Sequence, residues 1–200
     1  MHMAEADEFQ THSLRVMGIH SMPETGTFVS ISDAGSIKVC ENAKGTVVKE
    51  MTLSKLNGGK DAALKAMVSL PSRNLIAVAD ALGNIYLLDT RTTDLELVKV
   101  LSTETGAQIR GLACNVHENF IVAGSSDGAI TVFDLLTPGK EKNGKILVSF
   151  QGKENVRLVQ WRETPRREIL TGDQAGIVTV WDLREQEPVF VLQAHTDAIT

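Results

Sequence analysis

The sequence predicts an all-β protein built from four repeats of four short antiparallel strands. Three observations support this prediction: a template that recurs four times, apolar runs with a period of two residues, and turn-forming residues between the runs. In the template, a glycine is followed by aliphatic residues at the second and fourth positions and by an acidic residue at the sixth. The copies are Gly35-SIKVCE, Gly83-NIYLLD, Gly128-AITVFD and Gly176-IVTVWD, whose glycines lie 48, 45 and 48 residues apart.

Each copy of the template is expected to be the third of the four strands in its repeat. The second strands read TFVSIS, NLIAVA, NFIVAG and EILTGD, the first strands LRVMGI, ALKAMV, IRGLAC and VRLVQW, and the fourth strands TVVKEM, LELVKV, KILVSF and PVFVLQ. The segment DAALKAMVSL has helical spacing when taken alone, but its place in the register predicts a strand. The repeats span residues 10–51, 62–102, 107–151 and 155–194, and residues 195–200 begin a fifth.

A repeat of this length with four strands and a closing Trp181-Asp182 resembles the WD40 family of β-propellers. The resemblance implies four four-stranded antiparallel blades, in which the tryptophan packs the blade and the aspartate acts in the following turn. It also implies a polar network that joins a tryptophan, a strand Ser or Thr, a turn histidine and a turn aspartate. For Trp181, Thr171 stands at the Ser or Thr position of the network, but Gly152 and Ala175 stand where the histidine and the aspartate are expected. No blade has all four residues, so interleaved aliphatic side chains are expected to supply most of the stability.

The two ends of the sequence indicate an incomplete propeller. The segment FQTH at Phe9–His12 matches LQAH at Leu192–His195, so a fifth blade begins where the sequence stops. Propellers have four to eight blades, and an open arc leaves apolar blade faces uncovered. We expect the remaining blades to belong to a longer chain. The alternatives are that two copies associate through their open ends in an eight-blade ring, or that four blades close on themselves.

Composition excludes several classes of protein. The net charge of −5 argues against a nucleic-acid binder, and 42% hydrophobic with 22% charged residues is typical of a soluble protein. No apolar run is long enough for a membrane span, and the N-terminus lacks a secretory signal. A cytoplasmic location is therefore expected, with the nucleus as the alternative. Cys40 and Cys114 both lie in apolar runs and are interpreted as small core residues.

No enzymatic site is predicted. The stretch NGGKD at Asn57–Asp61 fails the phosphate-loop pattern because Ser54 replaces its first glycine and Asp61 its Ser or Thr. The histidines are scattered over different blades without a partner at a fixed offset. We therefore expect no catalytic residue, cofactor or metal, and we expect other proteins as partners.

Two groups of basic residues are candidate protein-binding sites. Loops between first and second strands and between third and fourth strands lie on one face of a propeller. LTPGKEKNGK (residues 136–145) and RETPRRE (residues 162–168) share that face in neighbouring blades, and they are expected to form a patch for an acidic, phosphorylated or lipid partner. Its residues are Lys140, Lys142, Lys145, Arg162, Arg166 and Arg167. The alternative is that Glu141, Glu163 and Glu168 offset these charges, which then only solvate the loops.

The second group consists of Arg91 and Arg184, each two positions after the acidic residue of the template. Their spacing is similar to the WDxR box that substrate receptors of cullin–RING ubiquitin ligases present to their adaptor. Arginines that pair locally are the alternative. We predict a non-enzymatic protein–protein interaction scaffold or adaptor. The alternatives are such a substrate receptor, or the propeller of an endosomal phosphoinositide-binding protein, since GDQAGIVTVWDL resembles WD-repeat proteins with a FYVE domain.

Overall fold

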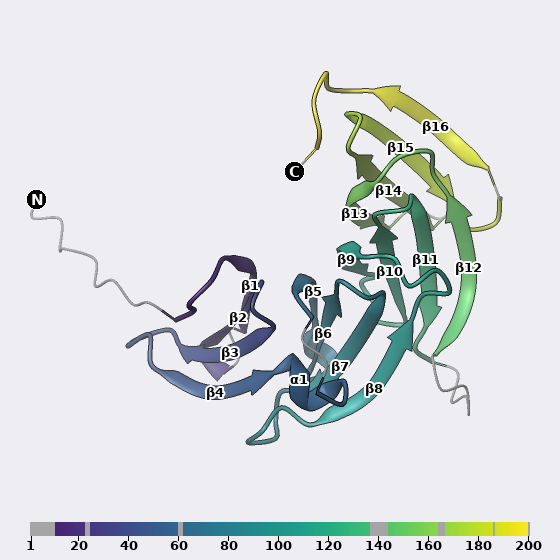
Figure 1. The fold of residues 1–200 in the computed structure, drawn as a ribbon. Helices are drawn as coiled ribbons and strands as arrows, with labels where there is room; N and C mark the ends of the chain where they lie inside the picture. The colour runs from purple at the N-terminus through teal and green to yellow at the C-terminus, as the bar shows by residue number, and fades with distance from the viewer. Residues whose placement is uncertain are drawn as a thin grey trace, which may run out of the picture.

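Four antiparallel sheets form the fold, as the repeat predicts. The computed structural model describes residues 11–22, 25–59, 62–136, 144–163, 167–185 and 187–199. Within each four-stranded sheet the strands follow one another in chain order. Figure 1 shows the sheets as blades that fan out in an arc, with the first strand of each blade inside and the fourth at the rim. The first and fourth blades lie at opposite ends of this open arc, so the four blades do not close into a ring.

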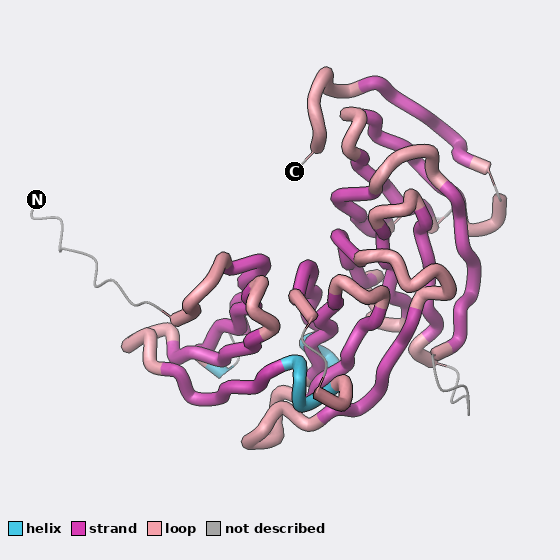
Figure 2. The backbone as a smooth tube through the Cα atoms, in the orientation of Figure 1, coloured by secondary structure: helices cyan, strands magenta, loops and turns pink. Residues whose placement is uncertain are grey.

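The strands are short and similar in length in every blade, and they dominate the backbone in Figure 2. The first blade contains β1 (Val16–Met22), β2 (Thr27–Ser32), β3 (Ser36–Glu41) and β4 (Val47–Thr52). The second contains β5 (Leu64–Leu70), β6 (Leu75–Asp80), β7 (Asn84–Asp89) and β8 (Leu97–Ser102). The third contains β9 (Ile109–Cys114), β10 (Phe120–Ser125), β11 (Ala129–Asp134) and β12 (Lys145–Gln151). The fourth contains β13 (Val156–Arg162), β14 (Glu168–Asp173), β15 (Ile177–Asp182) and β16 (Pro188–Gln193).

The helical elements are short. The segment with helical spacing forms strand β5, which confirms the prediction from the register. The connection between β4 and β5 contains α1 (Leu53–Leu56), a single turn that the period-two pattern did not predict. Its Leu53 is buried in the core between the first two blades, so the turn inserts an apolar side chain where the blades meet. The connection between β5 and β6 contains the 3-10 turn η2 (Pro71–Arg73).

The template glycine is required by the backbone of the turn between the second and third strands. In the four blades it has φ values of 76°, 83°, 86° and 79°, in the left-handed region that side chains disfavour. Space is also restricted at this point. A Cβ atom added to Gly128 would lie 2.6 Å from the carbonyl oxygen of Gly152, which precedes the next blade. Glycine therefore both forms the turn and admits the chain that leads to the neighbouring blade.

Three hydrophobic clusters hold the arc together, and each one lies between two adjacent blades. Ile31 and Ile76 join the first and second blades, and the third cluster brings Ile130 of blade 3 against Trp181 of blade 4. Complete burial of an aliphatic or aromatic side chain stabilises a fold by about 1.5–3 kcal/mol, so each blade depends on its neighbour. On β16, in contrast, all six residues are exposed.

The polar network is present in pieces, as expected. The Nε1–H of Trp181 donates to Thr171 Oγ1 at 2.9 Å, and in blade 1 the imidazole of His12 contacts the hydroxyls of Ser30 and Ser36 at 2.7 Å each. The turn between β14 and β15 in blade 4 does contain a carboxylate, however. Asp173 accepts the backbone N–H groups of Ala175 and Ile177, so an aspartate two positions before Ala175 closes the turn.

Cys40 is buried and Cys114 is half-buried. Burial raises the pKa of the Cys114 thiol to about 12, which keeps it protonated and unreactive at neutral pH. Across the described residues, no helix has the length and apolar character that a membrane crossing requires.

Candidate functional site

The basic residues singled out in the sequence lie in connections of two kinds, between first and second strands and between third and fourth strands. Because strands alternate in direction, both kinds of connection lie at the same end of every blade. We call this surface the arginine face. Its described residues include 71–74, 90–96, 115–119 and 183–185, together with Arg162, Glu163 and Arg167. Lys140, Lys142 and Arg166 lie outside the described residues.

Arg91 and Arg184 occupy equivalent positions and have the same geometry. Each guanidinium makes two-nitrogen contact with the aspartate two positions earlier, at Nη2–Oδ2 distances of 2.6 Å for Asp89 and 2.5 Å for Asp182. The hydrogen bonds from the Arg91 side chain lower the pKa of the Asp89 carboxyl to about 2. Both arginine side chains nevertheless stay 67% and 62% exposed. The local pairing that the sequence offered as an alternative is thus present, and both guanidiniums remain accessible.

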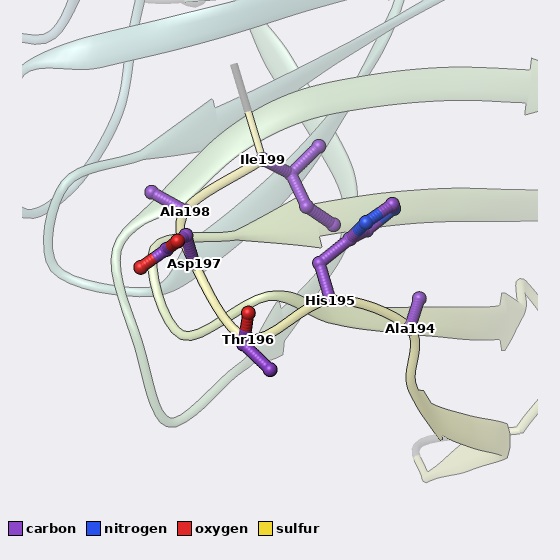
Figure 3. A pocket seen from close by; sticks show the side chains of 6 residues that line it. All are labelled: Ala194, His195, Thr196, Asp197, Ala198 and Ile199. Atoms are coloured by element: carbon purple, nitrogen blue, oxygen red, sulfur yellow. The ribbon is translucent and has the colours of Figure 1, made fainter.

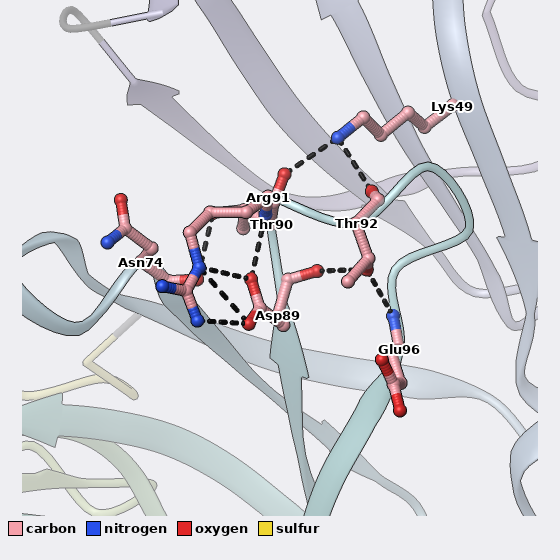
Figure 4. Close-up of polar contacts among 7 residues, drawn as sticks. All are labelled: Lys49, Asn74, Asp89, Thr90, Arg91, Thr92 and Glu96. Carbon is pink, nitrogen blue, oxygen red and sulfur yellow. Dashed lines mark hydrogen bonds and ion pairs between the residues drawn. The ribbon is translucent and has the colours of Figure 1, made fainter.

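The connection that carries Arg91 is fixed from two sides (Figure 4). On one side, the Nζ atom of Lys49 in β4 donates to the carbonyl oxygens of Thr90 and Thr92, at 2.7 and 2.8 Å. On the other side, the Thr90 hydroxyl donates to the carbonyl oxygen of Asn74 at 2.9 Å. Lys49 belongs to blade 1, so this loop of blade 2 is held by its neighbour as well as by its own sheet.

Two carboxylates make similar links between the later blades. Glu118 of blade 3 accepts the backbone N–H groups of Ser72 and Arg73 in blade 2, at 2.9 and 3.2 Å. Glu163 of blade 4 accepts the N–H of Val116 in blade 3 at 2.6 Å. Hydrogen bonds with a charged partner are stronger than neutral ones. The arginine face is therefore a continuous surface in which each blade's loops are bonded to the next blade.

The predicted basic patch is partly neutralised in its described residues. Arg162 pairs with Glu168 at 3.1 Å, and Lys145 lies 3.8 Å from Asp134. Arg167 is exposed and has a φ of 55°, an uncommon backbone conformation for a side chain of this size. Arg162 ends β13 and Arg167 lies in the connection that follows it, whereas Lys145 begins β12 of the preceding blade.

Two hollows open on the arginine face, and sequence analysis found neither. One, of about 450 Å³, lies between blades 1 and 2, where His20 contacts the hydroxyl of Ser69. The other, of about 250 Å³, lies between blades 3 and 4. We call it the blade 3–4 pocket; its lining includes Asn115, Asn119, Phe120, Trp161, Glu163 and Arg167. The available signal was Trp161, one of only two tryptophans, which stands outside the template.

A larger hollow of about 590 Å³ follows β16, and all six lining residues, 194–199, are consecutive. Figure 3 shows them along a single turn of chain, with no side chain contributed from another blade. This hollow is therefore the inside of one loop and offers no convergent chemistry. In the part of the chain that the structure describes, no group of three or more His, Cys, Asp or Glu side chains is placed to hold a metal ion.

Comparison with known proteins points to one repeat family. Residues 67–164 match the family model described as the anaphase-promoting complex subunit 4 WD40 domain. The WD repeat-containing protein 55 homolog of Drosophila persimilis is 27% identical over 130 residues, which cover 65% of this chain and 24% of that protein. Human protein transport protein Sec31A is 26% identical over 125 residues, covering 58% and 10%. Protein transport protein SEC31 of Chaetomium globosum is 26% identical over 180 residues, covering 87% and 14%.

The chain thus spans about a quarter or less of the length of these relatives. Among solved structures, the computationally designed Ika8 protein matches with a TM-score of 0.70 and 18% identity, covering 94% of this chain and 52% of the designed one. At this identity the match establishes the arrangement of the blades alone.

Proposed function

We propose, from the premise that the chain belongs to the WD40-repeat family, that it is a non-enzymatic scaffold or adaptor that binds other proteins through its arginine face. Members of this family are generally non-enzymatic scaffolds for protein interaction. The cytoplasm is the proposed location, with the nucleus as the alternative, and imaging of the tagged chain in cells tests it.

One observation supports the choice of this face. Arg91 and Arg184 are held in the same orientation by their own aspartates, and their side chains are still about two-thirds exposed. A guanidinium has five N–H donors, and the aspartate engages only those on two nitrogens. The arginines therefore offer further donors to a partner without losing much conformational freedom on binding, which favours affinity.

The test is quantitative affinity purification of the tagged chain from cells. The Arg91→Ala/Arg184→Ala chain is compared with the unchanged chain and with Lys153→Ala, a control that removes an exposed cation at the opposite end of the blades. We expect a set of co-purifying proteins to be lost from the double variant and kept by the control. Identical sets from all three chains would refute a role for the arginine face.

A second candidate is a substrate receptor of a cullin–RING ubiquitin ligase, because Arg184 follows Trp181-Asp182 with the WDxR spacing and its guanidinium is exposed. Binding of the purified ligase adaptor to the unchanged chain, and its loss from the Arg91→Ala/Arg184→Ala chain, is the expected result. Equal binding by both chains excludes this mode of recruitment. The resemblance to WD-repeat proteins with a FYVE domain stays a prediction, which a Cys-rich zinc pattern in the coding sequence after residue 200 would support.

A further inference from the structure

One residue that lines the blade 3–4 pocket has a buried donor without an acceptor among the described residues. Trp161, at the end of β13, is 9% exposed, and no residue in the described ranges accepts a hydrogen bond from its Nε1–H. The other tryptophan, Trp181, has such an acceptor in Thr171. Buried polar groups in folded proteins are nearly always hydrogen-bonded, so an unpaired donor on a residue that lines a pocket is a group that a ligand can satisfy when it displaces the atoms covering it.

The apolar part of the pocket is a pair of stacked rings from two blades. Phe120 of β10 and Trp161 of β13 lie with ring centroids 5.9 Å apart and planes within 6° of each other. Both rings line the pocket. They provide a flat apolar surface for the methylene groups of an inserted side chain.

The amide groups of the lining are oriented by the protein itself. The Oδ1 atom of Asn115 accepts the backbone N–H groups of Asn119 and Phe120, at 2.8 and 2.9 Å. The Oδ1 atom of Asn119 accepts a hydrogen bond from Arg73 at 3.2 Å. Because the Asn115 oxygen already accepts two hydrogen bonds and the Asn119 oxygen accepts one, the NH₂ groups are what these two asparagines offer to an anion.

The lining contains a guanidinium that can pair with an anion. Arg167 contributes a guanidinium, and within the described ranges it forms no ion pair. Among the described residues of the lining, which also include His117, Glu163 is the one carboxylate, and its Oε1 accepts the N–H of Val116. An anion that meets Arg167 and several N–H donors gains more than it loses to Glu163, and the two oxygens of a planar carboxylate match the fork of the guanidinium.

We propose that the blade 3–4 pocket binds the carboxylate of an acidic side chain from a partner protein. The exposed guanidinium of Arg167 is the first donor, the Nε1–H of Trp161 is a second donor once the atoms that cover it are displaced, and the stacked rings hold the methylene groups. A volume of about 250 Å³ lies below the usual size of a pocket for a whole ligand molecule and suits one inserted side chain. The inference rests on the proposed function, since it names the chemistry of the partner.

Nuclear magnetic resonance of the ¹⁵N-labelled chain tests the proposal directly, because two tryptophans give two indole N–H signals. Trp161→Phe removes one signal and so assigns both. The chain is titrated with three blocked tripeptides: acetyl-Gly-Glu-Gly-amide, the same peptide with Gln, and the same peptide with phosphoserine. We expect the Glu peptide to shift the Trp161 signal saturably while the Trp181 signal, bonded to Thr171, stays in place.

Two comparisons show whether the charge matters. The Gln peptide is expected to bind about tenfold more weakly than the Glu peptide, and Arg167→Gln to weaken Glu-peptide binding about tenfold, since each change removes a charge-assisted hydrogen bond. Lys153→Gln is the control, an exposed cation at the opposite end of the blades, and it should leave binding unchanged.

The proposal is overturned if the Trp161 signal does not move, if the Gln peptide binds as well as the Glu peptide, or if the phosphoserine peptide binds more tightly. Titration of the unchanged chain decides this even where a variant fails to fold. A negative titration together with loss of bound proteins from the Arg91→Ala/Arg184→Ala chain rejects the pocket and leaves the scaffold proposal standing. If the Glu peptide binds and the Arg91→Ala/Arg184→Ala chain still retains all co-purifying proteins, the pocket is the binding site and the two arginines are not.

Discussion

The two tryptophans allow the unsatisfied donor to be tested by stability alone. Both are buried at strand ends, and each stacks or packs on a phenylalanine, Trp161 on Phe120 and Trp181 on Phe150. They differ in the indole N–H, which among the described residues has an acceptor in Trp181 and none in Trp161. Replacing either one by phenylalanine removes the N–H and a similar part of the ring. The difference between the two variants therefore reports on the hydrogen bond.

The expected magnitude follows from the contacts. Trp181→Phe loses a hydrogen bond that contributes about 1 kcal/mol net and leaves the buried hydroxyl of Thr171 without its donor, which costs about 1–3 kcal/mol. Trp161→Phe removes a buried donor that was already unpaired and so relieves a penalty of similar size. We expect Trp181→Phe to be more destabilising than Trp161→Phe by at least about 2 kcal/mol, or roughly 4–8 °C in Tm for a chain of this length.

Urea unfolding followed by circular dichroism measures both free energies of unfolding. A double-mutant cycle with Thr171→Val supplies the control, because the Trp181–Thr171 pair should show a coupling of about 1 kcal/mol, whereas Trp161 and Thr171 should be additive. Equal destabilisation by the two phenylalanine substitutions, or a larger loss at Trp161, would refute the assignment of an unpaired N–H.

Three further predictions concern the fold. Gly128→Ala should cost about 1–3 kcal/mol more than Gly58→Ala, because both have positive φ but only the first Cβ meets backbone, and thermal unfolding compares them. Burial, with a smaller effect of Lys38, lowers the pKa of His12, so the unfolded chain binds more protons than the folded chain. The free energy of unfolding should therefore fall as the pH drops below about 6.5. Urea titrations at pH 7 and pH 5.5 should show a smaller decrease in this free energy for His12→Gln than for the unchanged chain. Lys49→Met should lower the free energy of unfolding by about 1 kcal/mol through its two carbonyl contacts, discounted for partial exposure, with no such loss in exposed Lys153→Met.

The blades could be predicted from the sequence because their determinants are local and repeated. The glycine of the template needs a positive φ, the aliphatic residues after it alternate, and these requirements recur every 45 to 48 residues. The helix α1 escaped prediction because a single turn is too short to show a period. The turn carboxylate of blade 4 was sought at residue 175, where the family pattern has it, and Asp173 supplies it instead.

The blade 3–4 pocket escaped prediction for a different reason. Its two rings come from Phe120 and Trp161, which are 41 residues apart and meet because β13 packs against β9 and β10 of the preceding blade. The contact between Glu163 and the N–H of Val116 spans 47 residues in the same way. A pattern along one strand carries no signal for such pairs, since neither residue belongs to the repeated template.

The structure also shows that the arginines singled out by their spacing are not the ones that supply free charge on the arginine face. By spacing alone, Arg91 and Arg184 stand out, but each shares its charge with its own aspartate, and the pair presents little net charge to a partner. Such fixed guanidiniums discriminate through hydrogen-bond geometry, so their substitution should alter which partner binds with little change in salt dependence. Arg167 has no ion pair in the described ranges, and its contribution to binding should weaken as the salt concentration rises. Binding measured at two salt concentrations for Arg167→Gln and Arg91→Gln separates these two roles.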